Sequence, residues 1–209
     1  SAQNNSLDAS EADGYSIIDT KINPETGEMT YVTEPHFDMP TPQTPPEGSS
    51  PAANGDEALK SAVSVGSTKV IKDNNGVSRT LKCLYIGKYC TVWGCTSDKN
   101  ANSGLEISTA SATEIGQQFD SYCPSVISSF GKWFDADNDD KLAIYCYDID
   151  QNYINGVSGS YTAGYFMPAN LIDNNGYVNG IYVGQSSKAL GTDCIHLDTY
   201  PSMSSSRTS

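Results

Sequence analysis

The feature that most constrains the fold is an acidic turn that runs directly into an apolar segment, within FGKWFDADNDDKLAIYCYDID at residues 130–150. The turn, residues 135–140, carries four aspartates, and the segment that follows Lys141 is LAIYCYDI. An almost continuous apolar run of this length is typical of a strand buried on both faces of a sheet. We therefore expect residues 142–149 to form a central strand, with the acidic turn at its start.

The acidic turn has the spacing of a calcium loop. Asp135, Asp137 and Asp139 match the first, third and fifth positions of an EF-hand-like loop, where alternate carboxylates converge on one hard cation. The backbone carbonyl of Lys141 would supply the seventh position. Position six is an aspartate instead of glycine, and position twelve is a cysteine instead of glutamate. We predict a calcium site with the metal ligands Asp135, Asp137, Asp139 and Lys141 and a Kd of about 10⁻⁴–10⁻³ M. The alternative is a solvated acidic turn without an ion.

The clearest helix pattern in the chain precedes the acidic turn. Apolar side chains recur there at helical spacing, on Ile115, Phe119, Tyr122, Val126, Ile127 and Phe130. Ser111 or Thr113 can cap the amino end of this helix, and Gly131 can end it. Pro124 predicts a kink or two consecutive helices.

Extended segments are expected on both sides of the helix, at residues 68–72, 80–86, 89–95, 161–171, 177–183 and 193–200. An Asp-Asn-Asn-Gly turn at residues 73–76 favours a hairpin between the first two. Strands, one long helix and then strands again predict an α+β (mixed α/β) fold, a twisted β-sheet or meander with the helix packed on it.

The first part of the chain has a different composition. Residues 1–62 contain few large apolar side chains, and residues 35–51, PHFDMPTPQTPPEGSSP, are rich in proline. Such a segment buries too little apolar surface to offset its ordering entropy. We interpret residues 1–62 as a disordered or propeptide-like leader, with a hairpin at residues 15–32 as an alternative inside it. Residues 63–203 then form the α+β domain, and residues 204–209 form a polar tail.

The net charge and the number of cysteines limit which binding partners and which cellular location are expected. A net charge of −13 repels nucleic-acid phosphates and anionic lipid, so neither is an expected partner. The sequence has no apolar run long enough to span a bilayer, and its composition favours a secreted or cell-surface protein. Six cysteines permit three disulfides. Cys83–Cys90 or Cys83–Cys95 would be a local bridge, and buried thiols are the alternative.

The residues given contain no complete catalytic set. The two histidines are His36, in the proline-rich segment, and His196, in an apolar segment close to Asp193 and Asp198. His196 is a candidate ligand or base, although a single strand histidine is more often structural. A Cys–His nucleophile pair would require one cysteine to meet His196. The sequence contains no His-Glu-x-x-His, no Gly-Lys-Ser/Thr phosphate loop and no Gly-x-Ser-x-Gly elbow.

Five segments follow one another in the order LKCLYIGKYCTVWG, EIGQQFDSYCPSVISSFG, FDADNDDKLAIYCYDI, GYFMPANLI and DCIHLDTYPSM. In this order they resemble secreted bacterial zinc metallopeptidases of the hyicolysin type, and the resemblance covers residues 66–203. In such enzymes a YDI strand, a GYF segment and an IDTYP segment precede the zinc-binding His-Glu-x-x-His helix. The resemblance implies metal-assisted hydrolysis of protein or peptide substrates in full-length relatives, with a zinc-bound water and a glutamate base. It also implies an edge strand that holds an extended substrate.

The zinc helix would be expected shortly after Pro201, where this sequence continues as SMSSSRTS. We therefore expect the upstream portion of an exported zinc metallopeptidase, inactive alone because the zinc-binding residues are not in the sequence. The alternative is a non-enzymatic, calcium-stabilised extracellular binding or adhesion module.

Overall fold

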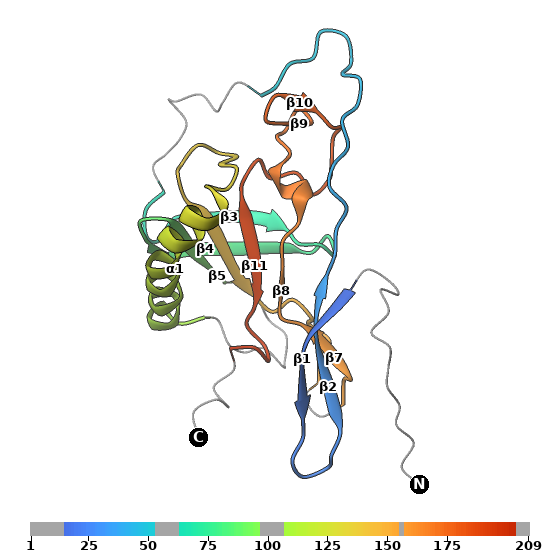
Figure 1. Cartoon of the computed structure of the whole chain (residues 1–209), viewed down its shortest axis with the longest axis vertical. Coiled ribbons are helices and arrows are strands. Elements are labelled where there is room, and N and C mark those ends of the chain that lie inside the picture. Colours follow the sequence, from blue (N-terminus) through green and yellow to red (C-terminus); the bar gives the residue numbers. More distant parts are fainter. Residues whose placement is uncertain (1–14, 53–62, 97–106, 155–156, 204–209) are drawn as a thin grey trace.

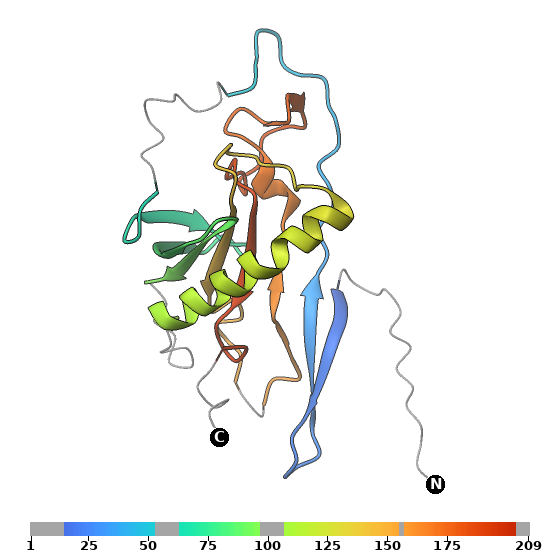
Figure 2. The same cartoon turned by 60° about the vertical axis from the view of Figure 1, so that its left-hand side comes forward.

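A six-stranded mixed sheet forms the centre of the molecule, in the computed structural model that describes residues 15–52, 63–96, 107–154 and 157–203. The strand order is β3-β4-β5-β6-β11-β8, and one long helix crosses one face (Figure 1, Figure 2). The strands are β3 (Thr68–Lys72), β4 (Ser78–Ile86), β5 (Cys90–Cys95), β6 (Leu142–Tyr147), β11 (Cys194–Asp198) and β8 (Gly164–Tyr165). The predicted α+β fold is confirmed.

β6 lies inside the sheet and is parallel to both of its neighbours, β5 and β11. Its side chains alternate between two apolar layers. Tyr145 and Tyr147 belong to one layer, while Ile144 and Cys146 belong to the layer under the helix. The prediction of a central strand buried on both faces is therefore confirmed.

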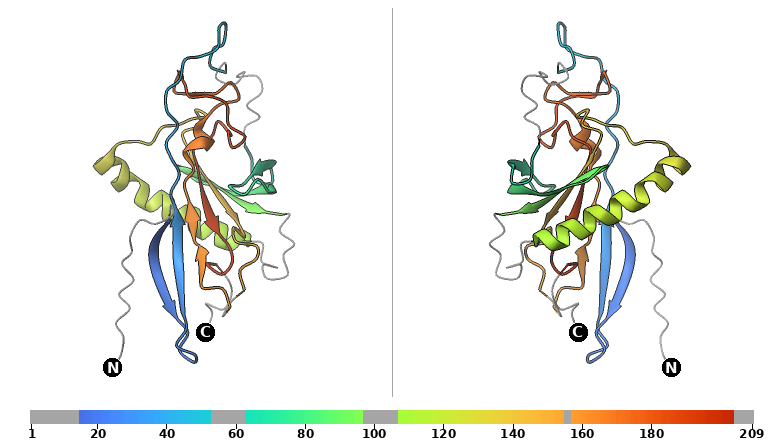
Figure 3. Two further views of the ribbon diagram at one scale, coloured as in Figure 1. Left: turned by 90° about the vertical axis from the view of Figure 1, so that its right-hand side faces the viewer. Right: turned by 90° about the vertical axis from the view of Figure 1, so that its left-hand side faces the viewer.

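The helix, α1 (Thr109–Phe130), is continuous. It begins earlier than predicted, because the Ser108 hydroxyl accepts a hydrogen bond from the Ser111 amide and so caps the amino end. Gly131 ends the helix at a φ of 84°, as predicted. Pro124 stands inside α1 without dividing it into two helices. Figure 3 shows the carboxyl end of α1 extending beyond the sheet.

Part of the predicted leader is structured. β1 (Tyr15–Ile22) and β2 (Met29–Pro35) form the alternative hairpin, and β2 also pairs in parallel with β7 (Ser160–Thr162). Val32 is buried with Tyr153 and Tyr161. The hairpin is attached to distant parts of the chain by the backbone pairing of β2 and by one buried valine. The polar composition of residues 15–35 does not predict this attachment. Residues 1–14 and 53–62 of the leader, and the tail at residues 204–209, lie outside the described residues.

The later extended segments are shorter than predicted. Residues 161–171 are divided between β7, β8 and a short 3-10 helix, η1 (Pro168–Leu171). Residues 177–183 form a small hairpin of β9 (Tyr177–Val178) and β10 (Ile181–Tyr182). The segment at 161–171 is interrupted because proline at the start of η1 favours a helical turn over a strand.

No disulfide joins the six cysteines, all of which are buried and lie in the described part of the chain. The predicted local bridges do not form for a geometric reason. Cys83 and Cys90 belong to opposite apolar layers of the sheet. Cys83 stands opposite Trp93 in the β4–β5 register, whereas Cys95 stands opposite Leu81. No helix among the described residues is long and apolar enough to cross a bilayer.

The close approach of α1 to the sheet depends on Gly116. A Cβ at this position would lie 2.1 Å from Cδ1 of Tyr85, on β4. Gly116→Ala should therefore destabilise the protein by about 1–2 kcal/mol in urea unfolding, because overpacking outweighs the better helix propensity of alanine. Gly159→Ala, where an added Cβ meets nothing within 4 Å, is the matched control and should change little. Greater stability of the Gly116→Ala protein would contradict this packing.

Candidate functional site

The acidic turn is closed by its own side chains. The Asp135 carboxylate accepts hydrogen bonds from the amides of Asp139, at 3.1 Å, and Asp140, at 3.0 Å. Lys132 forms an ion pair with Asp140, and its Nζ also lies 3.7 Å from the Asp135 carboxylate. Asp139 accepts a hydrogen bond from the amide of Lys141 at 2.8 Å. These contacts fix the position of Asp135 at the start of the central strand.

Asp193, directly before β11, completes a cluster of three carboxylates. Its carboxylate accepts hydrogen bonds from the Trp133 indole, at 2.6 Å, and from the Ala136 amide, at 2.9 Å. One carboxylate oxygen each from Asp135, Asp137 and Asp193 lies within 4.8 Å of the other two. Such a set of oxygen donors suits a hard divalent cation.

The structure brings together only part of the predicted ligand set. Asp135 and Asp137 belong to the cluster, while Asp139 is outside it. The side chain of Lys141 donates hydrogen bonds to the carbonyls of Gly87, at 2.7 Å, and Lys88, at 2.9 Å. Sequence reasoning did not select Asp193 as a ligand, because a local loop pattern cannot include a residue far downstream. The sequence signal that could have identified Asp193 is its position directly before an apolar strand segment, which matches the position of the acidic turn before residues 142–149.

Burial makes the cluster electrostatically unfavourable without a cation. Burial, followed by the charges of Asp139 and Asp193, raises the pKa of Asp137 to about 7. Burial also raises the pKa of Asp193. The loop lies beside a cavity of about 620 Å³ whose wall includes Asp137, Asn138 and Asp173. The cluster is thus open to ions from solvent.

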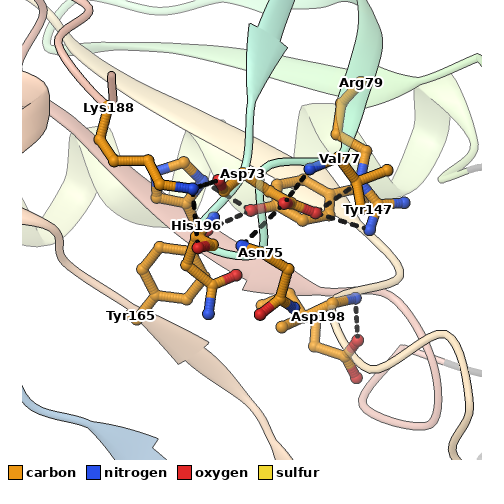
Figure 4. Close-up of polar contacts among 11 residues, drawn as sticks. Asp73, Asn75, Val77, Arg79, Tyr147, Tyr165, Lys188, His196 and Asp198 are labelled. Carbon is orange, nitrogen blue, oxygen red and sulfur yellow. Dashed lines mark hydrogen bonds and ion pairs between the residues drawn. The ribbon is translucent and has the colours of Figure 1, made fainter. Parts of the chain in front are cut away.

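A second polar cluster, around His196, is buried in the sheet (Figure 4). Nδ1 of His196 lies 2.9 Å from the Tyr147 hydroxyl, and Nε2 lies 2.9 Å from Oδ1 of Asn170. Asn170 Oδ1 can only accept, and its Nδ2 donates to the Lys188 carbonyl at 2.8 Å. His196 therefore carries its proton on Nε2 and accepts on Nδ1 from Tyr147, whose hydroxyl also contacts that of Tyr165. Burial lowers the pKa of His196 to about 3, so the ring is neutral.

Cys194 is the cysteine that meets His196, with Sγ 3.7 Å from Nε2. Burial raises the pKa of Cys194 to about 12, while the pKa of His196 is about 3. The proton therefore stays on sulfur at neutral pH, and both side chains are buried. This pair lacks the thiolate that a cysteine nucleophile needs.

The segments that carried the resemblance meet in this core. Tyr147 belongs to YDI, Tyr165 to GYF, and Asp198 to LDTYP. The Asp198 carboxylate accepts hydrogen bonds from the amides of Ile149, at 3.0 Å, and Ser202, at 3.3 Å. The Asp198 contacts therefore join the end of β11 to the residues that follow β6.

A buried ion pair lies beside the same core and was not selected from the sequence. Nη2 of Arg79 lies 2.9 Å from the Asp73 carboxylate, and its guanidinium stands 4.8 Å above the Tyr147 ring. The Asp73 carboxylate also accepts hydrogen bonds from the amides of Asn75 and Val77, so it closes the hairpin turn that the sequence predicted.

The pKa of Asp137 predicts a dependence of stability on pH. Its pKa is about 7 in the folded protein and about 3.9 in the unfolded chain, so the folded state binds more protons between these values. The stability that this group contributes is present below pH about 4 and is lost as pH rises through about 7. Asp137→Asn should therefore stabilise the metal-free protein increasingly from pH about 4 to about 7, in urea unfolding. The lowered pKa of His196 makes stability rise with pH, which opposes the effect of Asp137. Because His196 is present in both proteins, comparing the variant with wild type at each pH cancels its contribution.

Asp38→Asn, which removes one exposed carboxylate that is not part of the cluster, is the control. A constant difference between Asp137→Asn and wild type would show that Asp137 ionises normally in the folded protein.

Comparison of sequences with known proteins finds a metalloprotease relative. No known protein-family model matches the sequence. The chain is 34% identical over 134 residues, 64% of its length, to the neutral metalloprotease ShpI of Staphylococcus hyicus. The chain spans about a quarter of that relative, since the match covers 26% of its length. The predicted kinship is thereby confirmed: over this stretch the chain is related to part of a metallopeptidase.

Proposed function

We propose that this chain forms the substrate-side sheet of an exported zinc metallopeptidase and does not hydrolyse peptides alone. The observation that carries the proposal is the similarity to a neutral metalloprotease over 64% of the chain. The acidic composition supports a secreted or cell-surface location. The contribution of this chain would be to hold an extended protein or peptide substrate rather than to perform the bond cleavage.

The end of the sheet at β8 is the proposed peptide-binding edge. β8 is the last strand in the sheet and runs antiparallel to β11. The outer side of an edge strand offers backbone groups that an extended peptide can pair with. The Tyr165 ring stacks on His196 with ring centroids 4.3 Å apart, which holds this short strand in a fixed position.

The described residues of this chain do not fit a catalytic zinc site. His196 is buried and both ring nitrogens are engaged. His36 is exposed, with Nε2 2.9 Å from the Ser16 hydroxyl. The acidic cluster offers only carboxylate oxygens, which suit calcium better than the nitrogen and sulfur ligands typical of zinc. Zinc is therefore expected only in full-length relatives.

Calcium is the cation proposed for the acidic cluster. Asp135, Asp137 and Asp193 would form its core, and Asp139 and the Lys141 carbonyl are the further ligands proposed from the sequence. Calcium takes six to eight oxygen ligands, so the two sets are compatible. The ion would join the start of β6 to the start of β11. A calcium-stabilised binding or adhesion module, the second candidate function, needs this site and no cleavage.

The calcium proposal predicts a change in melting temperature. With a Kd of about 1 mM, calcium at about 10 mM should stabilise the protein by about 1.4 kcal/mol, or about 3–6 °C. Asp193→Asn and Asp137→Asn should each remove most of this increase, and Asp38→Asn should retain it. An unchanged calcium response in Asp193→Asn would place the ion elsewhere or exclude it.

The proposed inactivity predicts the result of a peptidase assay. The purified chain should release no peptides from casein with or without added zinc, because its described residues supply no zinc-binding set. Release of peptides that a chelator abolishes would overturn the proposed division of roles. Calcium-dependent stability without cleavage would agree with both candidate functions.

A further inference from the structure

A proline-rich strap, residues 36–52, leaves β2, passes β8 and continues beside the β9–β10 hairpin (Figure 1). It begins at the edge of the sheet, where the Ala163 amide, just before β8, donates a hydrogen bond to the Thr33 carbonyl of β2 at 3.2 Å. Phe37 is partly buried against the core, with its ring 5.6 Å from that of Tyr165 on β8. The strap therefore contacts the strand that is proposed to bind peptides.

Hydrogen bonds hold the far part of the strap to residues 173–183. The Gln43 amide donates to the Tyr182 carbonyl at 2.8 Å, and Nε2 of Gln43 donates to the Val183 carbonyl at 2.8 Å. Beyond it, Ser49 is hydrogen-bonded to the Tyr177 hydroxyl, the Ser50 carbonyl accepts from Asn175, and the Ala52 amide donates to Asp173. Residues 41–51 are nevertheless exposed to solvent. Because the part beside β8 is held chiefly by Phe37 and Gln43, it can open at less than the cost of global unfolding.

The composition of the strap favours an extended backbone. Its five prolines all follow Met39, in the part that contacts residues 173–183. Proline pre-forms an extended backbone, so little chain entropy is lost when the strap is docked. The strap thus resembles an extended peptide ligand in shape, and among the described strands it is β11 that pairs with β8.

We propose that the strap is an internal competitor of extended peptides at β8, and that a peptide reaches this edge only when Phe37 and Gln43 release their contacts. This inference rests on the proposed function of β8 as a peptide-binding edge. Because the strap belongs to the same chain, its effective concentration at the edge is high, about millimolar for a short tether. A weakly binding peptide in solution would be excluded while the strap is docked.

The test measures peptide binding to the full chain by fluorescence anisotropy, with a labelled synthetic peptide of residues 36–52 as the probe. Phe37→Ser combined with Gln43→Ala should lower the apparent Kd at least about tenfold relative to wild type, because apparent affinity follows the fraction of molecules with an open edge. Gln43→Ala alone, the milder change, should give an intermediate value. Met39→Ala, at a strap residue that is 64% exposed, is the matched control and should behave as wild type.

A casein digest, added as unlabelled competitor, should displace the probe from the double variant, and hydrogen exchange at residues 164–166 should slow when the digest binds. Three results would overturn the inference in variants that retain a cooperative melting transition. The first is unchanged affinity for the probe, which would leave the relationship to metallopeptidases untouched. The second is a gain in affinity for the probe that the casein digest cannot compete away, because the strap would then recognise only its own sequence. The third concerns the digest itself. Equal and tight binding of the digest to wild type and variant would support β8 as a peptide edge but contradict a competing strap.

Discussion

The parallel pairing of β6 with β11 is the constraint on which the rest of the structure depends. In this register Ala143 stands opposite Cys194, and the Ala143 amide donates a hydrogen bond to the Asp193 carbonyl at 3.0 Å. Because parallel strands begin at the same end of a sheet, the residues preceding each strand must meet there. The acidic turn before β6 and Asp193 before β11 are brought together for this reason. At the other end, the same pairing lets the Thr199 amide donate to the Tyr147 carbonyl at 3.0 Å.

Buried polar groups then hold the sheet in one arrangement. His196 stands near the middle of β11 and connects Tyr147 on β6 with Asn170 on η1. Each of these polar atoms has a partner inside the protein, so their burial is compensated. The edge strand β8 is positioned through the stacking of Tyr165 on His196. The proposed peptide edge and the proposed cation site therefore depend on one strand, β11, which lies between the central strand and β8.

Local patterns predicted the elements of this fold better than its long-range contacts. The apolar run after Lys141 was sufficient to predict the central strand, since burial on both faces leaves no polar alternation. Helical spacing and Gly131 located α1, although its true cap, Ser108, lies before the apolar pattern begins. Asp193 could not be predicted as a neighbour of the acidic turn, because the pairing of β6 with β11 is a long-range contact that local sequence patterns do not determine.

The hairpin of β1 and β2 was predicted only as an alternative, and its attachment was not predicted, because it depends mainly on backbone pairing with β7. The composition of a segment indicates how much apolar surface it can bury. It does not indicate with which strand elsewhere in the chain the segment can form backbone hydrogen bonds.

A double-mutant cycle between Asp137 and Asp193 tests the central claim most directly. At pH about 8 without divalent cations both carboxylates are expected to be charged, so neutralising one with asparagine should reduce the effect of neutralising the other. The account predicts a coupling of at least about 0.5 kcal/mol in the free energy of unfolding, typical of residues in contact. Additive effects of Asp137→Asn and Asp193→Asn would show that the two side chains are apart, and would contradict the register that brings them together.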